Sequence, residues 1–370
     1  MKKKILILYI THLSGHHRAA KAIERSLKIL DENCQVVCLD SLKQLHTYSS
    51  GIINFLYSFV IQKASFIWRS IYDKKSVIRT LNPVKNLIHF SNLKKIEKLI
   101  KEFRPDAVVC TQAFPCGVVS FFKKRKNNNF PLIAAITDLW PHGFWFYKEV
   151  DYYIVSSDWC KARFEALAVP QEKIKIFGIP IMPEFSRPID LEASARQFKI
   201  NLNLPRIIIM GGGSGLGPLR EIALALDGSN LNFQIIVICG KNKKLQEWFS
   251  NKNFKKPFHI FGYTEEVYKI MSFSDIIITK PGGITVSESL SKGLATIVFK
   301  PIPGQEENNL RFLLNEKLVL QAHTPGQVKF FVEDLLKNNE KLQYFRARGL
   351  SYAKPRSSLD IAQLVLNSIK

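Results

Sequence analysis

The sequence predicts an α/β protein with two domains, each built on a parallel sheet. Its 370 residues exceed the usual size of one domain. In both halves, short apolar runs alternate with segments of helical pattern, as expected when helices connect buried parallel strands. Glycine and polar clusters follow several of these runs. Because such sheets bind ligands at the carboxyl ends of their strands, we take these clusters as candidate functional sites.

The apolar runs give expected domain limits. The first domain covers residues 1–180, a proline-marked linker covers 181–204, the second domain covers 205–350, and residues 351–370 form a C-terminal helix. Strands are expected in the first domain at 4–11, 35–40, 106–112, 132–138, 151–157 and 173–179. In the second domain they are expected at 206–210, 234–239, 258–262, 275–279 and 295–299.

Composition indicates a globular protein whose basic charge would attract a polyanion. Hydrophobic residues make up 46% of the chain and charged residues 23%, while the net charge is +22. Residues 1–150 hold 24 Lys and Arg against 10 Asp and Glu, a surplus of 14. Nucleic acid and the anionic leaflet of a membrane are both partners that such a charge would attract.

The six cysteines are scattered and form no Cys-x-x-Cys pair, so we expect core residues in a reducing compartment and no structural zinc. The first ten residues resemble the start of a signal peptide. Their apolar part, residues 5–10, is too short for one and is better explained as a buried first strand.

Residues 280–309 contain the main candidate binding site of the second domain. The run 275–279 leads into Gly282 and Gly283, a helical pattern starts at Thr285, and a second run leads into the polar loop 301–309. The glycines allow close approach to the backbone, and a helix that follows presents free N–H groups and a positive dipole end. The expected ligand therefore carries an anion.

The polar residues of this segment have two interpretations each. Glu288 is suited to a vicinal diol such as a ribose, but Thr285–Glu288 also fits the S/T-x-x-E capping box. The cluster 305–309 is either part of the site or a solvated helix start.

The loop 211–217, Gly-Gly-Gly-Ser-Gly-Leu-Gly, follows another apolar run. No register fits G-x-G-x-x-G, and Pro218 and Leu219 stand where a Walker A motif has Lys and Ser or Thr. The loop nevertheless offers backbone N–H groups and the Ser214 hydroxyl to a diphosphate.

Two loops of the first domain carry candidate residues. Gly15 and His16 follow the first strand at the start of a helix that runs to about Leu30. Asp138 ends the run 132–138, where it is suited either to orienting a base or an acceptor hydroxyl, or to forming an Asx turn. For His16, the alternative is a helix cap or a surface residue.

Residues 51–75 are rich in aromatic and aliphatic side chains, including Trp68, but polar residues interrupt them too often for a transmembrane helix. The segment is expected either to lie in a membrane interface or an acceptor groove, or to pack into the core. Lysines and arginines follow directly, from Lys74 onwards.

Together, these motifs resemble glycosyltransferases of the GT-B arrangement, which have two facing Rossmann-like domains. The similarity lies in Gly-His-x-x-Ala-Ala at 15–20, Thr-Asp…His…Trp at 137–145, the glycine loop, and the Pro-Gly-Gly and Pro-Ile-Pro-Gly-Gln-Glu-Glu motifs of 280–309. Within that group the motifs are similar to those of monogalactosyldiacylglycerol synthases and bacterial diacylglycerol glucosyltransferases. The family usually has a glycine where Leu13 stands.

The resemblance implies an inverting transferase that moves a hexose, glucose or galactose, from a UDP-sugar to diacylglycerol, peripherally at the cytoplasmic face of the cell membrane. It implies no cofactor, no bound metal and no nucleic acid partner. His16 would be the base, supported by Asp138. Nucleotide-sugar contacts are expected from Gly15, Gly212, Gly213, Ser214, Gly262, Tyr263, Gly282, Gly283, Thr285, Glu288, Gln305, Glu306 and Asn309. Acceptor or membrane contacts are expected from Trp68, His142 and Trp145. The C-terminal helix is expected to cross back to the first domain.

Two other functions fit parts of the sequence. A lipid II synthase, which transfers N-acetylglucosamine to a polyprenyl-linked cell-wall precursor, shares the domain plan and the Thr-Val-Ser-Glu helix. A basic nucleic-acid-binding protein would explain the charge, but not the glycine loops, Glu288 or His16.

Overall fold

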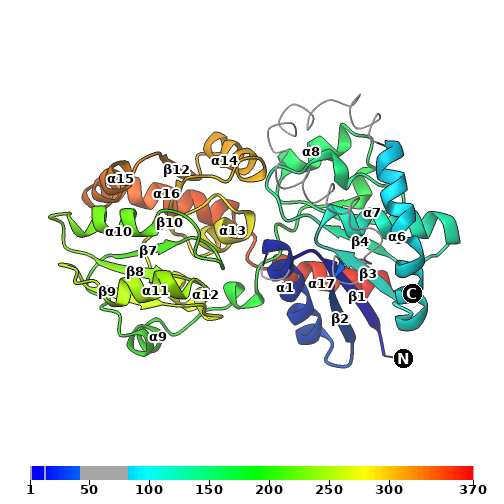
Figure 1. Ribbon diagram of the computed structural model, residues 1–370, viewed down its shortest axis with the longest axis horizontal. Helices are drawn as coiled ribbons and strands as arrows, with labels where there is room; N and C mark the ends of the chain where they lie inside the picture. The colour runs from blue at the N-terminus through cyan, green and yellow to red at the C-terminus, as the bar shows by residue number, and fades with distance from the viewer. Residues whose placement is uncertain (1, 12–13, 42–81, 370) are drawn as a thin grey trace. The chain divides into compact units, whose positions relative to one another are not determined.

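Two six-stranded parallel sheets form the centres of two units. The computed structural model describes residues 2–11, 14–41 and 82–369 (Figure 1). The first unit comprises Met1–Pro183 and Arg356–Lys370, and the second comprises Glu184–Pro355. Trp68 and the rest of the aromatic segment 51–75 lie outside the described residues, as does Leu13.

The first sheet has the strand order β2-β1-β3-β4-β5-β6. Its strands are β1 (Lys4–Tyr9), β2 (Gln35–Asp40), β3 (Ala107–Cys110), β4 (Leu132–Ala135), β5 (Tyr152–Ile154) and β6 (Ile174–Lys175). Its helices are α1 (Gly15–Leu30), α6 (Asn82–Phe103), α7 (Ala113–Lys126), α8 (Asp158–Glu165) and α17 (Ser357–Ser368), with short 3₁₀ turns at Gly143–Trp145 (η2) and Gln171–Lys173 (η3). The chain passes from β1 to β2 and then to β3 on the other side of β1, so the strand order reverses between β1 and β3.

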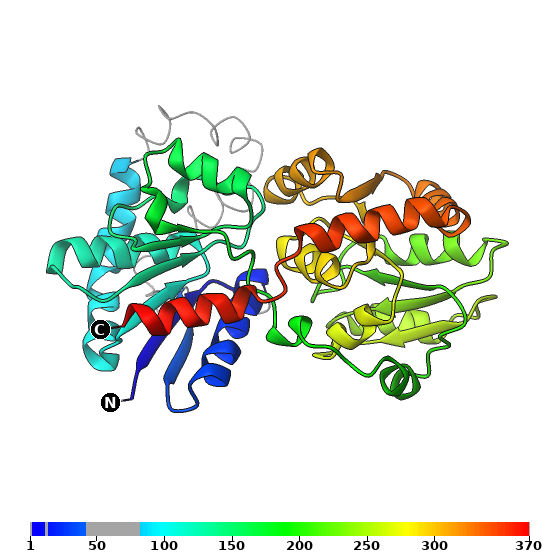
Figure 2. The same ribbon diagram turned by 180° about the vertical axis from the view of Figure 1, so that it is seen from behind.

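The C-terminal helix α17 is part of the first unit, where it packs against α1 (Figure 2). The Ser26 hydroxyl of α1 donates to the Ser358 hydroxyl over 2.9 Å, and the Ile181 N–H donates to the Ser357 hydroxyl over 3.2 Å. Ile361 and Val365 of α17 are fully buried. A segment from the end of the chain therefore completes the core formed by its beginning.

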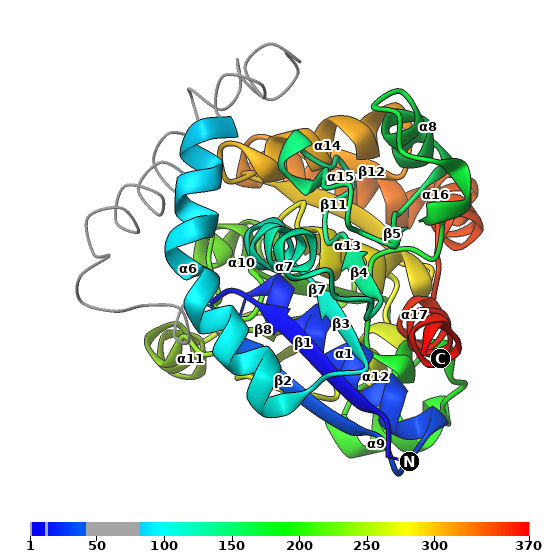
Figure 3. The same ribbon diagram turned by 90° about the vertical axis from the view of Figure 1, so that its right-hand side faces the viewer.

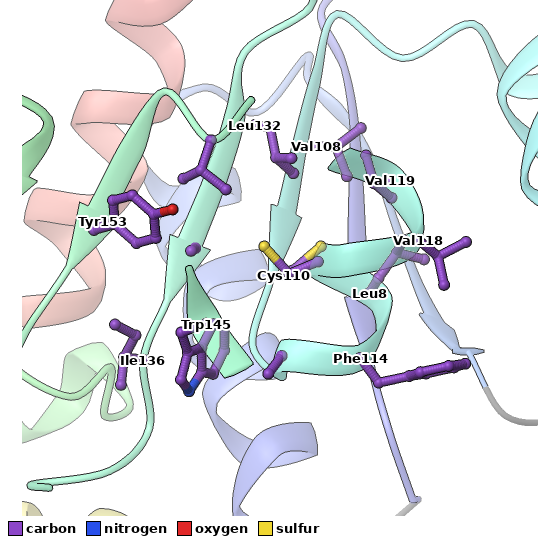
Figure 4. Close-up of a cluster of buried hydrophobic side chains, with 14 of the residues drawn as sticks. Leu8, Val108, Cys110, Phe114, Val118, Val119, Leu132, Ile136, Trp145 and Tyr153 are labelled. Carbon is purple, nitrogen blue, oxygen red and sulfur yellow. The ribbon is translucent and has the colours of Figure 1, made fainter. Parts of the chain in front are cut away.

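Strand β1 is buried on both faces, since its alternate side chains enter different cores. Ile5 and Ile7 pack with α1 and α17, and Leu6 and Leu8 pack with α6 and α7. Figure 3 shows these two pairs of helices on opposite sides of β1. In Figure 4, Leu8 lies with Val118 and Val119 of α7.

The second sheet has the order β12-β11-β10-β7-β8-β9. Its strands are β7 (Arg206–Met210), β8 (Gln234–Ile238), β9 (Phe258–Phe261), β10 (Ile276–Thr279), β11 (Ala295–Phe299) and β12 (Val319–Ala322). Its helices are α9 (Leu191–Phe198), α10 (Leu219–Asp227), α11 (Lys243–Ser250), α12 (Val267–Ser272), α13 (Gly283–Ser291), α14 (Gln305–Asn315), α15 (Pro325–Lys337) and α16 (Asn339–Tyr352), with a 3₁₀ turn at Pro183–Ser186 (η4). This doubly wound order reverses between β7 and β10.

The sequence pattern placed some boundaries incorrectly. Helix α13 begins at Gly283 with Gly282 as its N-cap, not at Thr285, so Thr285 and Glu288 form no capping box. Helix α9 lies inside the segment 181–204 that was expected to be a linker. Strand β12 was not predicted, because Val-Leu-Gln-Ala is short and partly polar. The C-terminal helix expected at 351–370 starts only at Ser357, because α16 ends at Tyr352.

A cluster of three charges secures the second sheet at the amino ends of β7 and β10. The Arg206 guanidinium donates to both carboxylate oxygens of Asp275 over 3.0 Å, and the Arg346 guanidinium donates to the same carboxylate over 3.4 Å. Arg346 also donates to the Gly293 carbonyl over 3.1 Å. The cluster therefore connects two strands, the turn before β11 and helix α16.

We predict that Asp275→Ala lowers the free energy of unfolding of the second unit by about 3 kcal/mol, because it leaves two partly buried guanidinium groups without their carboxylate. Urea denaturation measures this change. Glu192→Ala, which removes a pair with Arg196 that is more than two-thirds exposed on both sides, is the control and should change stability by less than about 1 kcal/mol. Equal effects of the two substitutions would contradict this role of Asp275.

Within the described parts of the chain, no helix is both long enough and apolar enough to cross a membrane.

Candidate active site

His16 lies where the strand order of the first sheet reverses. It is the second residue of α1, and its Nδ1 is 3.0 Å from the Thr111 carbonyl oxygen and 2.8 Å from the Thr137 hydroxyl. The Thr111 hydroxyl donates to the His16 carbonyl over 2.9 Å. Thr111 follows β3 and Thr137 follows β4, so the carboxyl ends of two strands fix a side chain that follows β1.

These contacts determine which ring nitrogen of His16 is protonated. A carbonyl oxygen only accepts hydrogen bonds, so Nδ1 carries the proton, and Nε2 keeps its lone pair. Burial lowers the pKa of His16 to about 4, although the Thr111 hydrogen bond acts in the opposite direction. The ring is therefore neutral at physiological pH, and Nε2 is able to accept a proton.

The same shift links His16 to folding. In the unfolded chain a histidine titrates near pH 6.5. As the pH falls from about 6.5 towards about 4, the unfolded state takes up a proton that the folded state does not bind, so the contribution of this residue to stability declines over that range.

We predict that NMR of ¹⁵N-histidine-labelled protein detects His16 as the neutral Nδ1–H tautomer down to about pH 5. The His16→Gln variant identifies its signals. Titration of the His16 signals near pH 6.5, or a proton on Nε2 in the neutral ring, would contradict the geometry described here.

The segment after β4 is held from α8. Asp138 is buried beside Thr137, and the Cys160 thiol of α8 donates to the next carbonyl, that of Leu139, over 3.2 Å. The rings of Trp140 and Trp159 lie 4.2 Å apart. Sequence reasoning selected Asp138 but assigned no role to Thr137, the side chain that reaches His16. The sequence feature that could have identified Thr137 is its place directly after a buried apolar run.

The structure corrects one expected acceptor residue. Trp145 has no exposed surface and packs in the core beside Ile136 and Tyr153, where it is unable to meet an acceptor (Figure 4). His142 is partly exposed and its ring stacks 6.1 Å from that of Trp145. Of the acceptor residues expected from the sequence, only His142 is thus both described and accessible.

In the second unit, the glycine loop follows β7 at the reversal of the strand order. A Cβ on Gly211 would lie 2.0 Å from the Leu216 carbonyl oxygen, and one on Gly240, after β8, would lie 2.4 Å from that of Gly213. Gly212 has φ +72°, in the left-handed region, with open space around it. The loop is therefore tightly folded, while Gly212 and the exposed Ser214 are accessible.

The turn Lys280–Gly283 follows β10, the neighbour of β7. Helix α13 begins there with no side-chain cap and no acidic residue in its first turn, so its first N–H groups are available to an anion. Thr285 is in the first turn of α13. Glu288 is the sixth residue of α13, which is too far from the helix start for a capping box, and its side chain is fully buried.

Helix α14 brings the expected residues Gln305, Glu306 and Asn309 beside this turn. Asn309 is almost fully buried, and its side chain donates to the Pro281 carbonyl over 3.2 Å. Glu306 pairs with Lys280 over 3.0 Å. Gln305 is the first residue of α14 and is partly exposed. Asn309 thus holds α14 against the turn at which α13 starts.

Two further residues lie at the same edge of the second sheet. Gly262 and Tyr263 follow β9, and Tyr263 is half-exposed. The Lys241 ammonium, which follows β8, lies 5.3 Å from the Tyr263 ring centre. In the first unit, Gly15 is the exposed first residue of α1. Across the described residues, no three His, Cys, Asp or Glu side chains are grouped to hold a metal ion.

Each of the two units matches the model of a known protein family. Residues 16–181 match the family model of monogalactosyldiacylglycerol synthase, and residues 206–355 match that of the glycosyltransferase family 28 C-terminal domain. Proteins named processive diacylglycerol beta-glucosyltransferase are similar over almost the whole length. Those of Bacillus cereus (strain B4264) and Bacillus pumilus (strain SAFR-032) are each 29% identical, with 98% of this chain and 93% and 94% of the relatives covered.

The chain is a glycosyltransferase whose two units resemble these two families. Solved structures agree with the GT-B fold predicted from the sequence. MurG of Acinetobacter baumannii matches this glycosyltransferase with a TM-score of 0.61 at 14% identity, covering 99% of both chains. SnogD of Streptomyces nogalater matches with a TM-score of 0.58 at 11% identity, covering 99% of this chain and 100% of its own.

Proposed function

We propose that this glycosyltransferase moves a hexose from a UDP-sugar to the hydroxyl of diacylglycerol with inversion at the anomeric carbon. The observation that carries the proposal is His16, a neutral histidine with an unprotonated Nε2 at the strand reversal of a unit that matches the lipid-synthase model. The names of the relatives support diacylglycerol as the acceptor.

In the proposed reaction, His16 acts as the general base. Its Nε2 takes the proton of the acceptor hydroxyl while the oxygen attacks the anomeric carbon, and the bond from that carbon to the diphosphate oxygen breaks. The electron pair of the broken bond leaves with UDP. The Thr111 carbonyl keeps the ring in the tautomer that this step needs, the Thr137 hydroxyl holds the ring in position, and Asp138 is proposed to orient the acceptor.

The donor is proposed to bind at the strand reversal of the second unit. The backbone N–H groups of Gly212, Gly213 and the start of α13 receive the diphosphate, so the chemistry needs no bound metal. The Gly262–Tyr263 backbone would hold the uracil, and Gln305 and Glu306 would bind the sugar hydroxyls. Glu288, expected from the sequence to bind the ribose, is fully buried like Trp145 and has no exposed surface to offer it.

The basic charge of the first unit favours peripheral binding at the cytoplasmic face of the membrane. Helices α6 and α7 pack together, and they carry exposed Lys94, Lys98, Lys101, Lys124 and Arg125. Of their acidic residues, Glu97 is paired with Lys101 and Lys126, and Glu102 with Lys98. A positive surplus therefore remains for anionic lipid headgroups.

The test is sugar transfer from a panel of labelled UDP-sugars to diacylglycerol in anionic mixed micelles, with products identified by mass. Transfer from one donor, glucose or galactose, is expected. Transfer only from UDP-N-acetylglucosamine to a polyprenyl-linked acceptor would support the lipid II alternative, for which the MurG likeness supplies the fold alone. Absence of both UDP binding and transfer would overturn the proposal.

We predict that His16→Ala lowers kcat by about 100-fold or more, because it removes the base, while the Kd for UDP stays within about twofold. His259→Gln is the control, since His259 lies in the second unit and contacts Gln234. Calorimetry with UDP and initial-rate kinetics measure both quantities. A parallel loss of UDP affinity and turnover in His16→Ala would exclude His16 as the base.

A further inference from the structure

The ion pair between Lys280 and Glu306 lies beside the turn that starts α13. The Lys280 ammonium is 3.0 Å from Glu306 Oε1, and both side chains are only 17% exposed. The other carboxylate oxygen, Oε2, accepts the Ile302 N–H over 2.8 Å. Glu306 is thus held on one side by the loop before α14 and on the other by a lysine that directly follows β10.

The position of this pair relative to the turn is well defined. Glu306 Oε1 is 3.9 Å from the place where a Cβ on Gly282 would lie, and Gly282 is the N-cap of α13. The buried Asn309 side chain keeps α14 against Pro281, in the same turn. A carboxylate and its counterion therefore stand at the edge of the backbone N–H groups that lack a side-chain cap.

A diphosphate bound at this turn would change the charge balance of the pair. Its negative charge would repel the nearby Glu306 carboxylate and attract the Lys280 ammonium, which has only one carboxylate partner among the described residues. Lys280 has a long flexible stem, so its ammonium is able to move while its backbone stays with β10.

We propose that Lys280 exchanges Glu306 for the diphosphate when the donor binds, and that the freed Glu306 carboxylate then accepts hydrogen bonds from the sugar hydroxyls. This inference rests on the proposed function. It makes Lys280 a catalytic residue: when the bond from the anomeric carbon to the phosphate oxygen breaks, the electron pair passes to that oxygen, and the ammonium balances the new charge without losing a proton. Binding of the sugar by Glu306 would then depend on the presence of the diphosphate.

If this exchange occurs, substitutions of Lys280 and of Glu306 should change the affinity for UDP in opposite directions. Lys280→Gln should raise the Kd for UDP by about 10- to 100-fold, because a charged contact is lost. Glu306→Gln should lower the Kd for UDP by about threefold or more, since it removes the competing counterion, yet it should weaken binding of the UDP-sugar relative to UDP. Calorimetry on the full-length protein measures both.

Matched controls separate this role from a structural one. Lys341→Gln and Asp334→Asn remove an ion pair between α15 and α16, and they should leave UDP affinity unchanged. The double variant Lys280→Met with Glu306→Gln removes both charges, so that neither is left unpaired, and should keep the wild-type melting temperature but a low kcat.

The inference is overturned if Lys280→Gln and Glu306→Gln change UDP affinity in the same direction or not at all, or if the double variant regains wild-type turnover. In each of these cases the wild-type protein still binds UDP, and the proposed function stands. Failure of the wild-type protein to bind UDP would instead overturn the proposed function and the inference with it.

Discussion

The reversal of strand order in each sheet is the constraint on which the candidate sites depend. Where neighbouring strands send their chains to opposite faces of the sheet, the loops after them separate and leave room at the carboxyl edge. In the first unit this happens between β1 and β3, and in the second between β7 and β10. His16 follows β1, the glycine loop follows β7, and the turn before α13 follows β10.

At the two reversals of strand order, the local chemistry depends on backbone groups that have no hydrogen-bond partner within a strand or helix. Strand ends supply carbonyl oxygens, and one of them sets the tautomer of His16. Helix starts supply N–H groups, and α13 leaves its own without a side-chain cap. In the proposed mechanism the first unit removes a proton, the second stabilises the charge of the leaving diphosphate, and neither step uses a metal.

Much of the fold was predictable from the sequence, because strands buried on both faces are continuous apolar runs. The bounds of β7 and β11 were predicted without error, and so were those of the partly exposed β2. The first helix was expected to run to about Leu30, where α1 ends. Boundaries set by other signals were less accurate. The helical pattern was expected to start at Thr285, but α13 starts at Gly283 with Gly282 at the N-cap position, which excludes the capping box as one of the two interpretations of Glu288.

Sequence could not reveal the contacts that give the candidate residues their chemistry. Thr111 and Thr137 are 95 and 121 residues from His16, and only the strand order brings them together. Trp145 fits the motif of an acceptor segment, yet as the last residue of η2 it is fully buried in the core. The pairing of Lys280 with Glu306 likewise depends on β10 and β11 being neighbours.

The stereochemistry of the product tests most directly the central claim, that one base-assisted displacement transfers the sugar. With an α-linked UDP-sugar as donor, direct attack by an acceptor oxygen deprotonated by His16 gives a β-linked glycolipid. Proton NMR of the anomeric hydrogen in the first product formed distinguishes the two anomers. A β-anomer is the predicted result, and an α-anomer would contradict the account, because retention requires a mechanism that His16 acting as a base does not supply.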